Sequence, residues 1–405
     1  MRGNFVLIHR YAGLAMTIIL ILVGVTGTLL AFYHELDALI NPRLHRVGPG
    51  ARLDPGELAE RAQRLAPGAQ VNSVWLANPN EAAEVSVSPR PDPVTGNSGK
   101  LDYDQILLDP ITGEELLRRE WGAITQGWHN LFPFIYKFHY SLALNDTGGW
   151  ILGITALVWT IDCFIGFYLT LPVVRSRREG GRGRGWWKSW RPSWLIKWPA
   201  GAFRLNFDIH RAFGLWTWVF LFVLAWSSVA FNLSQVYRPV MMSLFAMTDD
   251  AETPKLNKPL ETPRLDWRRG YAMARNLMAE QSAAKGFTIV RDQYFGLDRE
   301  RGIYTYSVMS SADIGRYGGT AIDLDANTGK LLTARIPGSE PAGDLITNWL
   351  IWIHTAAVFG LTMQVLIFVM GMVIIALSVT GVYLWWKKLR SRRIAAQRRI
   401  TAENG

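Results

Sequence analysis

The sequence predicts a mainly α-helical membrane protein with four transmembrane helices arranged in two parallel repeats, each with an outer α+β domain. Three observations predict this fold: four long apolar segments, an internal duplication, and clusters of basic residues beside some of the segments. Because 49% of the residues are hydrophobic and the four segments consist almost wholly of such residues, a bilayer is the expected surrounding of these segments.

The four apolar segments are Tyr11–Tyr33, Trp150–Pro172, Ala212–Phe231 and Leu361–Trp386. At a rise of about 1.5 Å per residue, each can cross the roughly 30 Å of hydrocarbon as a helix. The first is too long for the apolar core of a signal peptide, so we expect it to be retained as a membrane anchor.

Basic residues predict the orientation. Arg175–Arg204 is rich in Arg and Lys with the single acid Glu179, and Lys387–Arg399 contains no acid. Both segments are therefore expected in the cytoplasm with the N-terminus, and the two large polar segments on the opposite side, periplasmic or extracellular. The net charge of +10 is expected to face lipid headgroups, with no need for nucleic acid as a partner.

An internal duplication relates the two halves. The region around His139 repeats around His354, and Gly166–Leu169 repeats as Gly381–Leu384. Parallel repeats of this kind are related by a pseudo-twofold axis along the membrane normal.

The outer segments repeat too. Asp109–Gly113 and Asp325–Gly329 both read Asp-x-x-Thr-Gly, a pattern typical of hairpin turns. Helical stretches at Pro55–Leu65 and Asp266–Gln281 precede these turns, and alternating segments at residues 83–88 and 303–309 indicate strands. Each half should therefore carry a small α+β domain.

His354 lies too far before Trp386 for one helix confined to the membrane, so we expect breaks at Gly360 and at Asn145–Gly149, with interfacial half-helices before them. The predicted boundaries are residues 1–34 for the first transmembrane helix, 35–131 for the first outer domain, 132–174 for a half-helix and the second transmembrane helix, 175–208 for a basic Trp-rich cytoplasmic loop, 209–232 for the third transmembrane helix, 233–347 for the second outer domain, 348–388 for a half-helix and the fourth transmembrane helix, and 389–405 for a basic cytoplasmic tail.

Four of the seven histidines occupy equivalent positions in the two halves. His9 and His210 begin the first and third spans, whereas His139 and His354 precede the second and fourth. A twofold axis would bring each pair face to face, the arrangement of axial ligands that a six-coordinate haem iron requires. The pattern predicts two haems, one near each membrane face, and electron transfer between them. A histidine at a helix end can also be an ordinary interfacial residue.

Other residues leave alternatives open. His34 is either an interface residue or a haem ligand, and Arg10 and Arg211 either hold haem propionates or follow the positive-inside rule. Asp162 inside a span is a candidate proton or quinol contact.

The sequence also excludes some kinds of site. Cys163 is the only cysteine, so no site can be built from thiolates. Gly180–Gly185 lacks the spacing of a dinucleotide site. Non-haem metal is the weaker alternative to haem, because carboxylates are not found at ligand spacing from the histidines, and His45 and His129 are expected at the surface.

Several motifs recur in both halves and together resemble the PepSY-associated transmembrane proteins over nearly the whole chain. They are His-Arg-x-x-Gly-Leu at 9–14 and 210–215, Thr-Gly-x-x-Leu at 26–30 and 380–384, and the Asp-x-x-Thr-Gly hairpins. The resemblance is greatest to the ferric-siderophore reductases of the ferrioxamine-reductase type. It implies periplasmic PepSY-like domains, two b-type haems held by His9, His210, His139 and His354, a bacterial inner-membrane location, and reduction of a ferric siderophore with electrons from a quinol or a cytoplasmic donor.

Two other functions remain open. PepSY domains also occur as inhibitory modules, so a non-enzymatic envelope sensor or peptidase-modulating protein is one alternative. Parallel repeats and broken helices are also features of transporters, although intramembrane charges are few.

Overall fold

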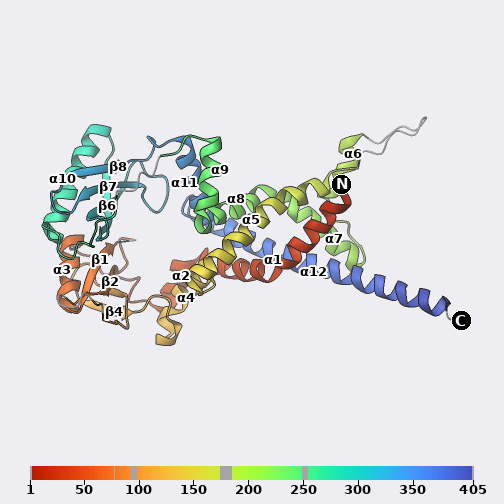
Figure 1. Ribbon diagram of the computed structural model, residues 1–405, viewed down its shortest axis with the longest axis horizontal. Helices are drawn as coiled ribbons and strands as arrows, with labels where there is room; N and C mark the ends of the chain where they lie inside the picture. Colours follow the sequence, from red (N-terminus) through yellow and green to blue (C-terminus); the bar gives the residue numbers. More distant parts are fainter. Residues whose placement is uncertain are drawn as a thin grey trace.

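The computed structural model of the chain is elongated, with a helical bundle joined to a β-sheet (Figure 1). It describes residues 2–76, 78–92, 97, 99–173, 185–248 and 254–403. Residues 174–184, where the predicted basic loop begins, lie outside the described residues. They include nearly all of Gly180–Gly185. Residues 404 and 405 of the predicted tail lie outside the described residues as well.

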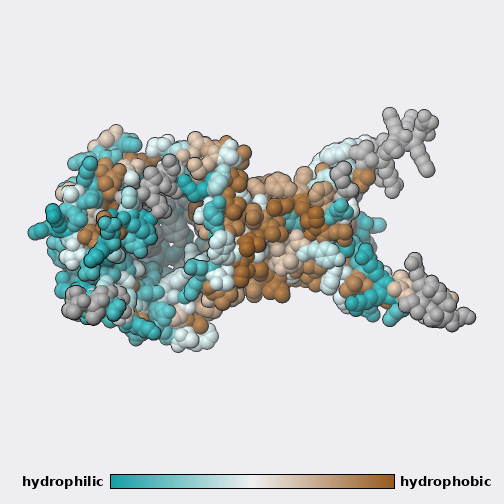
Figure 2. Space-filling model, viewed as in Figure 1, coloured by the Kyte–Doolittle hydropathy of each residue, from teal (hydrophilic) through white to brown (hydrophobic). Residues whose placement is uncertain are grey.

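Among the described residues, three helices are long and apolar enough to cross a membrane: α1 (Arg2–Leu30), α5 (Asn145–Thr170) and α12 (Leu361–Glu403) up to Gln397. Apolar side chains gather over this part of the molecule on the face shown in Figure 2. The chain is thus a mainly helical membrane protein with three candidate spans, or four when the bent pair α7 (Ala202–Trp216) and α8 (Trp218–Asn232) counts as one.

The predicted third transmembrane helix, residues 209–232, differs from the structure because the chain bends by 70° between α7 and α8. Thr217 at the bend has φ −107° and ψ 8°, outside the helical region. Its hydroxyl donates to the carbonyl of Phe213 at 2.7 Å, and the indole of Trp218 donates to the carbonyl of Cys163 at 2.9 Å. Hydroxyl bonds of this kind are often found where helices bend, and the Trp218 bond ties the bend to α5.

Short helices precede α5 and α12: α4 (Leu131–Ser141) and α11 (Ala342–His354). Gly360, with φ +54°, lies between α11 and α12, at the expected break. The break before α5 begins at Leu142 and reaches the expected stretch at Asn145, because Leu142, Ala143 and Asn145 all have φ between +51° and +55°, whereas the rest of Asn145–Gly149 is helical.

The bundle is packed closely where α1 crosses α12. A Cβ atom placed on Gly371 would lie 2.1 Å from the hydroxyl oxygen of Thr28 and 2.9 Å from the carbonyl oxygen of Gly24. Small residues at this crossing therefore let the two backbones approach closely, as is common between membrane helices.

In the part of the chain that the structure describes, the strands of the two predicted outer domains belong to one eight-stranded antiparallel sheet, in the order β4-β3-β2-β1-β5-β6-β7-β8. The two halves join where β1 pairs with β5, with Val74 opposite Phe295. The strands are β1 (Ala69–Trp75), β2 (Ala83–Pro89), β3 (Gln105–Leu108), β4 (Glu115–Arg119), β5 (Ile289–Asp298), β6 (Ile303–Ser310), β7 (Thr320–Asp325) and β8 (Leu331–Arg335).

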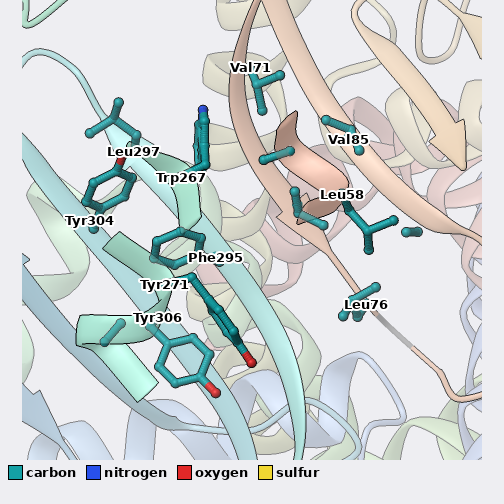
Figure 3. Close-up of a cluster of buried hydrophobic side chains, with 14 of the residues drawn as sticks. Leu58, Val71, Leu76, Val85, Trp267, Tyr271, Phe295, Leu297, Tyr304 and Tyr306 are labelled. Atoms are coloured by element: carbon teal, nitrogen blue, oxygen red, sulfur yellow. The ribbon is translucent and has the colours of Figure 1, made fainter. Parts of the chain in front are cut away.

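Helices α3 (Pro55–Leu65) and α10 (Trp267–Lys285) pack on the sheet, and the helical stretches expected there are confirmed. One hydrophobic core runs through both halves, with Leu58, Val71 and Val85 from the first and an aromatic group from the second (Figure 3). Phe295 stacks on Tyr304 at 4.9 Å between ring centroids. The remaining α-helices are α2 (Tyr33–Ile40), α6 (Trp186–Trp190) and α9 (Ser234–Leu244).

Candidate functional site

The first histidine pair lies in the half of the bundle away from the sheet and is called here the tail-side pair. His9 projects from α1 and His210 from α7, and their ring centroids are 6.1 Å apart with an angle of 63° between the ring planes. The chain therefore brings together the two histidines that the repeated His-Arg motif predicted to meet.

The second pair lies nearer the sheet and is called the sheet-side pair. His139 projects from α4 and His354 ends α11, with ring centroids 6.4 Å apart and an angle of 74° between the planes. Both residues come from the short helices that precede α5 and α12. The breaks before those two helices are what turn these rings toward each other.

Each ring of the tail-side pair is held through its Nδ1 atom. His9 Nδ1 lies 2.9 and 3.0 Å from the two carboxylate oxygens of Asp162 on α5. His210 Nδ1 lies 3.1 Å from the carbonyl oxygen of Leu377 and 3.0 Å from the hydroxyl of Thr380, both on α12. The carboxylate and the carbonyl can only accept, so Nδ1 carries the proton in both rings.

The sheet-side rings are held in the same way by hydroxyl groups. His139 Nδ1 lies 2.8 Å from the hydroxyl of Thr26, and His354 Nδ1 lies 2.6 Å from that of Ser227. Each hydroxyl already donates its proton to a carbonyl one turn earlier in its own helix, Thr26 to Leu22 at 2.8 Å and Ser227 to Val223 at 2.7 Å. Both hydroxyls therefore accept from the histidine, and Nδ1 again carries the proton.

The consequence is the same for all four rings, which keep an unprotonated Nε2 that can bind a metal ion. Two imidazoles on opposite sides of one metal, at metal–nitrogen distances of roughly 2 Å, place their ring centroids about 6 Å apart. The observed 6.1 and 6.4 Å agree with this spacing. A hydrogen-bonded Nδ1 with a free Nε2 is also the usual state of a histidine that ligates a metal.

Glycines lie beneath three of the rings. A Cβ atom on Gly27 would be 3.1 Å from Cε1 of His139, and one on Gly166 or Gly381 would be 3.4 Å from Cε1 of His9 or His210, respectively. The absence of a side chain at these positions lets the Cε1 edge of each imidazole approach the neighbouring helix closely. Gly27, Gly166 and Gly381 thus make room for the histidine rings.

A cavity of about 820 Å³ contains the sheet-side pair. Its volume falls within the roughly 300–1,000 Å³ typical of cofactor and ligand sites. Apolar residues of α1, α5 and α12 line one end, whereas the end near the sheet is polar and includes Arg119 and Arg316. The space is thus suited to a large apolar group with a polar edge beside His139 and His354.

His34 is not paired with His139 or His354 in the structure. Its Nδ1 atom lies 3.1 Å from Glu81 and its Nε2 atom lies 3.3 Å from the hydroxyl of Tyr317. His45, expected at the surface, is half-buried beside it, with Nδ1 at 3.0 Å from the same Glu81 oxygen. The expectation that carboxylates are not found at ligand spacing was therefore wrong for this part of the chain.

Burial of Glu81 opposes its negative charge, but hydrogen bonds from His34 and His45 outweigh this effect and hold the pKa of Glu81 well below its usual range. Burial likewise favours the neutral form of His45, but its hydrogen bonds to Asp37 and Glu81 raise the pKa of His45 to about 9. The cluster is a tightly coupled charged group at the polar end of the cavity.

The two arginines expected beside the tail-side pair differ in their contacts. Arg211 donates to the carboxylate of Asp208 at 2.9 Å and to the carbonyl of Pro192, so its guanidinium is engaged next to the pair. Arg10 makes no hydrogen bond or ion pair with any of the residues that the structure describes.

The model of one protein family, described as the PepSY-associated TM region, matches residues 6–388. The chain belongs to this family. No curated protein gives a significant match to the chain.

In this PepSY-associated protein, the sequence predicted both histidine pairs but not the hydroxyl groups that orient them. The available signal was that Thr26 and Ser227 lie equally far along the chain from His9 and His210.

Proposed function

We propose that this PepSY-associated membrane protein is a di-haem b reductase of the bacterial inner membrane, which passes electrons across the membrane to a ferric siderophore in the periplasm and releases the iron. The observation that carries the proposal is the geometry of the four histidines. Two pairs lie at different depths in the bundle, every Nδ1 is hydrogen-bonded, and the rings of each pair are spaced for one shared metal ion.

The residues fit haem as the shared group. His9 and His210 would hold one haem, and His139 and His354 the other within the cavity of about 820 Å³. A haem iron with imidazole on both sides exchanges single electrons and has no open position for dioxygen. The two sites lie roughly 25 Å apart along α1, judged from His9 and from Thr26, the partner of His139, at the helical rise per residue.

The hydrogen-bond partners of the two pairs supply a direction for electron flow. Asp162 places a carboxylate on His9, which makes the ring a stronger electron donor and favours the oxidised metal. Among the described residues, the Nδ1 atoms of the sheet-side rings have neutral partners, with the hydroxyls of Thr26 and Ser227 the nearest. The tail-side site should therefore have the lower reduction potential, so that electron transfer from it to the sheet-side site is favourable.

The remaining parts of the proposal follow from charge and from the family resemblance. The basic segments support a cytoplasmic tail side, where a quinol or a soluble reductant would donate the electrons, and a periplasmic sheet. The resemblance to ferric-siderophore reductases supplies the substrate. One-electron reduction releases the iron because hard oxygen ligands bind ferrous iron more weakly than ferric iron.

Replacing the histidines by alanine tests the two-site arrangement. H9A and H210A should each remove one haem and spare the other, and H139A and H354A should remove the opposite one, because each pair shares one iron. Optical spectra of the dithionite-reduced, purified proteins measure both haems, and H129A, which changes a histidine outside both pairs, is the control. Loss of the same haem from all four variants contradicts the arrangement.

The variant D162N tests the role of Asp162. Asparagine keeps the size and the hydrogen bond but removes the negative charge, so the reduction potential of the tail-side haem should rise while that of the sheet-side haem stays unchanged. A spectroelectrochemical titration of the two haems measures both potentials, and S227A, which changes a partner of the sheet-side pair, should move only the other potential. An unchanged tail-side potential in D162N refutes the assignment.

Reoxidation tests the reductase activity itself. Dithionite-reduced protein, freed of excess reductant and mixed anaerobically with a ferric siderophore such as ferrioxamine, should lose the spectrum of reduced haem as ferrous iron appears in a chelator assay. Iron-free siderophore is the control. A protein that stays reduced with ferric siderophores rejects the reductase assignment, and one without a haem spectrum favours a sensor or a transporter.

A further inference from the structure

A cluster of two histidines and one carboxylate lies outside both histidine pairs, at the polar end of the cavity. His34 projects from α2, His45 follows α2 in a loop, and Glu81 belongs to the loop between β1 and β2. Backbone hydrogen bonds tie the two loops together, from Ala82 to Leu44 at 2.8 Å and from Val47 to Asn80 at 2.9 Å. The three side chains are therefore held together by the fold and not by neighbouring positions in the sequence.

The donor atoms of the cluster are spaced as metal ligands. Nδ1 of His34 and Nδ1 of His45 lie 3.1 and 3.0 Å from the same oxygen, Oε1 of Glu81, and the three ligand atoms all lie within 4.8 Å of one another. Ligands bound to one ion at roughly 2.0–2.2 Å are themselves separated by about 3–3.5 Å. An ion can thus enter between these atoms with small side-chain movements.

Both rings are also held from behind, as metal-binding histidines are. Nε2 of His45 lies 2.8 Å from a carboxylate oxygen of Asp37, whose other oxygen accepts from Asn41 at 2.8 Å. Nε2 of His34 lies 3.3 Å from the hydroxyl of Tyr317. A carboxylate behind a histidine fixes the ring and makes its other nitrogen a better ligand.

We propose that His34, His45 and Glu81 bind a divalent first-row transition-metal ion. Two imidazoles and one carboxylate suit ferrous iron, zinc and cobalt, and leave open positions for water or for a ligand of the ion. The same cavity is lined by His139 and His354, so an ion at this cluster lies in the same space as the sheet-side pair.

Within the proposed function, on which this step rests, the site receives the product of the reaction. One electron from the quinol or cytoplasmic donor reduces ferric iron in the siderophore to ferrous iron, and no covalent bond is made or broken in that step. Ferrous iron then exchanges the hard oxygen ligands of the siderophore for imidazole nitrogen, which suits it better. The cluster thereby keeps the released ion from returning to the siderophore.

The test uses the full-length protein with an affinity tag that contains no histidine, stripped with EDTA and then titrated with Zn²⁺ or Co²⁺. These ions are counted by mass spectrometry after desalting, so haem iron does not interfere. The wild type should retain one ion per chain, whereas H34A, H45A and E81Q should bind at least 100-fold more weakly. D37N should weaken binding roughly 10-fold through its effect on His45.

H129A is the matched control and should bind like the wild type, because His129 lies outside the cluster. The thermal stability of each variant shows whether it is folded. A wild type that retains no more ion than the folded H34A/H45A double variant overturns the proposal. The haem spectrum of the same samples distinguishes the two proposals. Ion binding without haem refutes the reductase and supports the metal site. Haem without ion binding refutes the metal site and leaves the reductase proposal unaffected.

Discussion

The arrangement of this protein depends on the hydrogen bond at Nδ1 of each of the four paired histidines. Without these bonds the imidazoles would be free to rotate and to exchange tautomers, and no pair would present two unprotonated nitrogens to one point. With them, Asp162, Thr380, Thr26 and Ser227 fix both the proton and the ring plane. Each partner lies on a different helix from its histidine, so the packing of the bundle and the geometry of the two sites depend on each other.

Several features of the helices that look like irregularities serve this geometry. The left-handed residues Leu142 and Ala143 separate α4 from α5, and Gly360 separates α11 from α12, so that His139 and His354 can turn inward. The close crossing of α1 and α12 at Gly24 and Gly371 brings helices that carry residues of both sites together. The two pairs differ in their partners: a carboxylate holds one ring of the tail-side pair, whereas hydroxyls hold both rings of the sheet-side pair.

Much of this could be predicted from the sequence because it is encoded locally or repeated. Apolar length identified the spans, and α3 matches the predicted helix Pro55–Leu65. The duplication alone predicted that His9 faces His210 and that His139 faces His354. What could not be predicted depends on contacts between distant segments. The pairing of β1 with β5 has no local signal, and Glu81 meets His34 and His45 only after the sheet has formed. The chain bends at Thr217 within a continuous apolar pattern, where the indole of Trp218 donates to the carbonyl of Cys163 on another helix.

The most direct measurement of the central claim, that each histidine pair shares one haem iron, is electron paramagnetic resonance of the oxidised, purified full-length protein. The account predicts two distinct low-spin ferric signals, each of the kind given by iron between two imidazoles and together equal to two spins per chain. The rings cross at 63° and 74°, so the two signals should be distinguishable. A high-spin spectrum, a single low-spin centre, or no haem signal would contradict it.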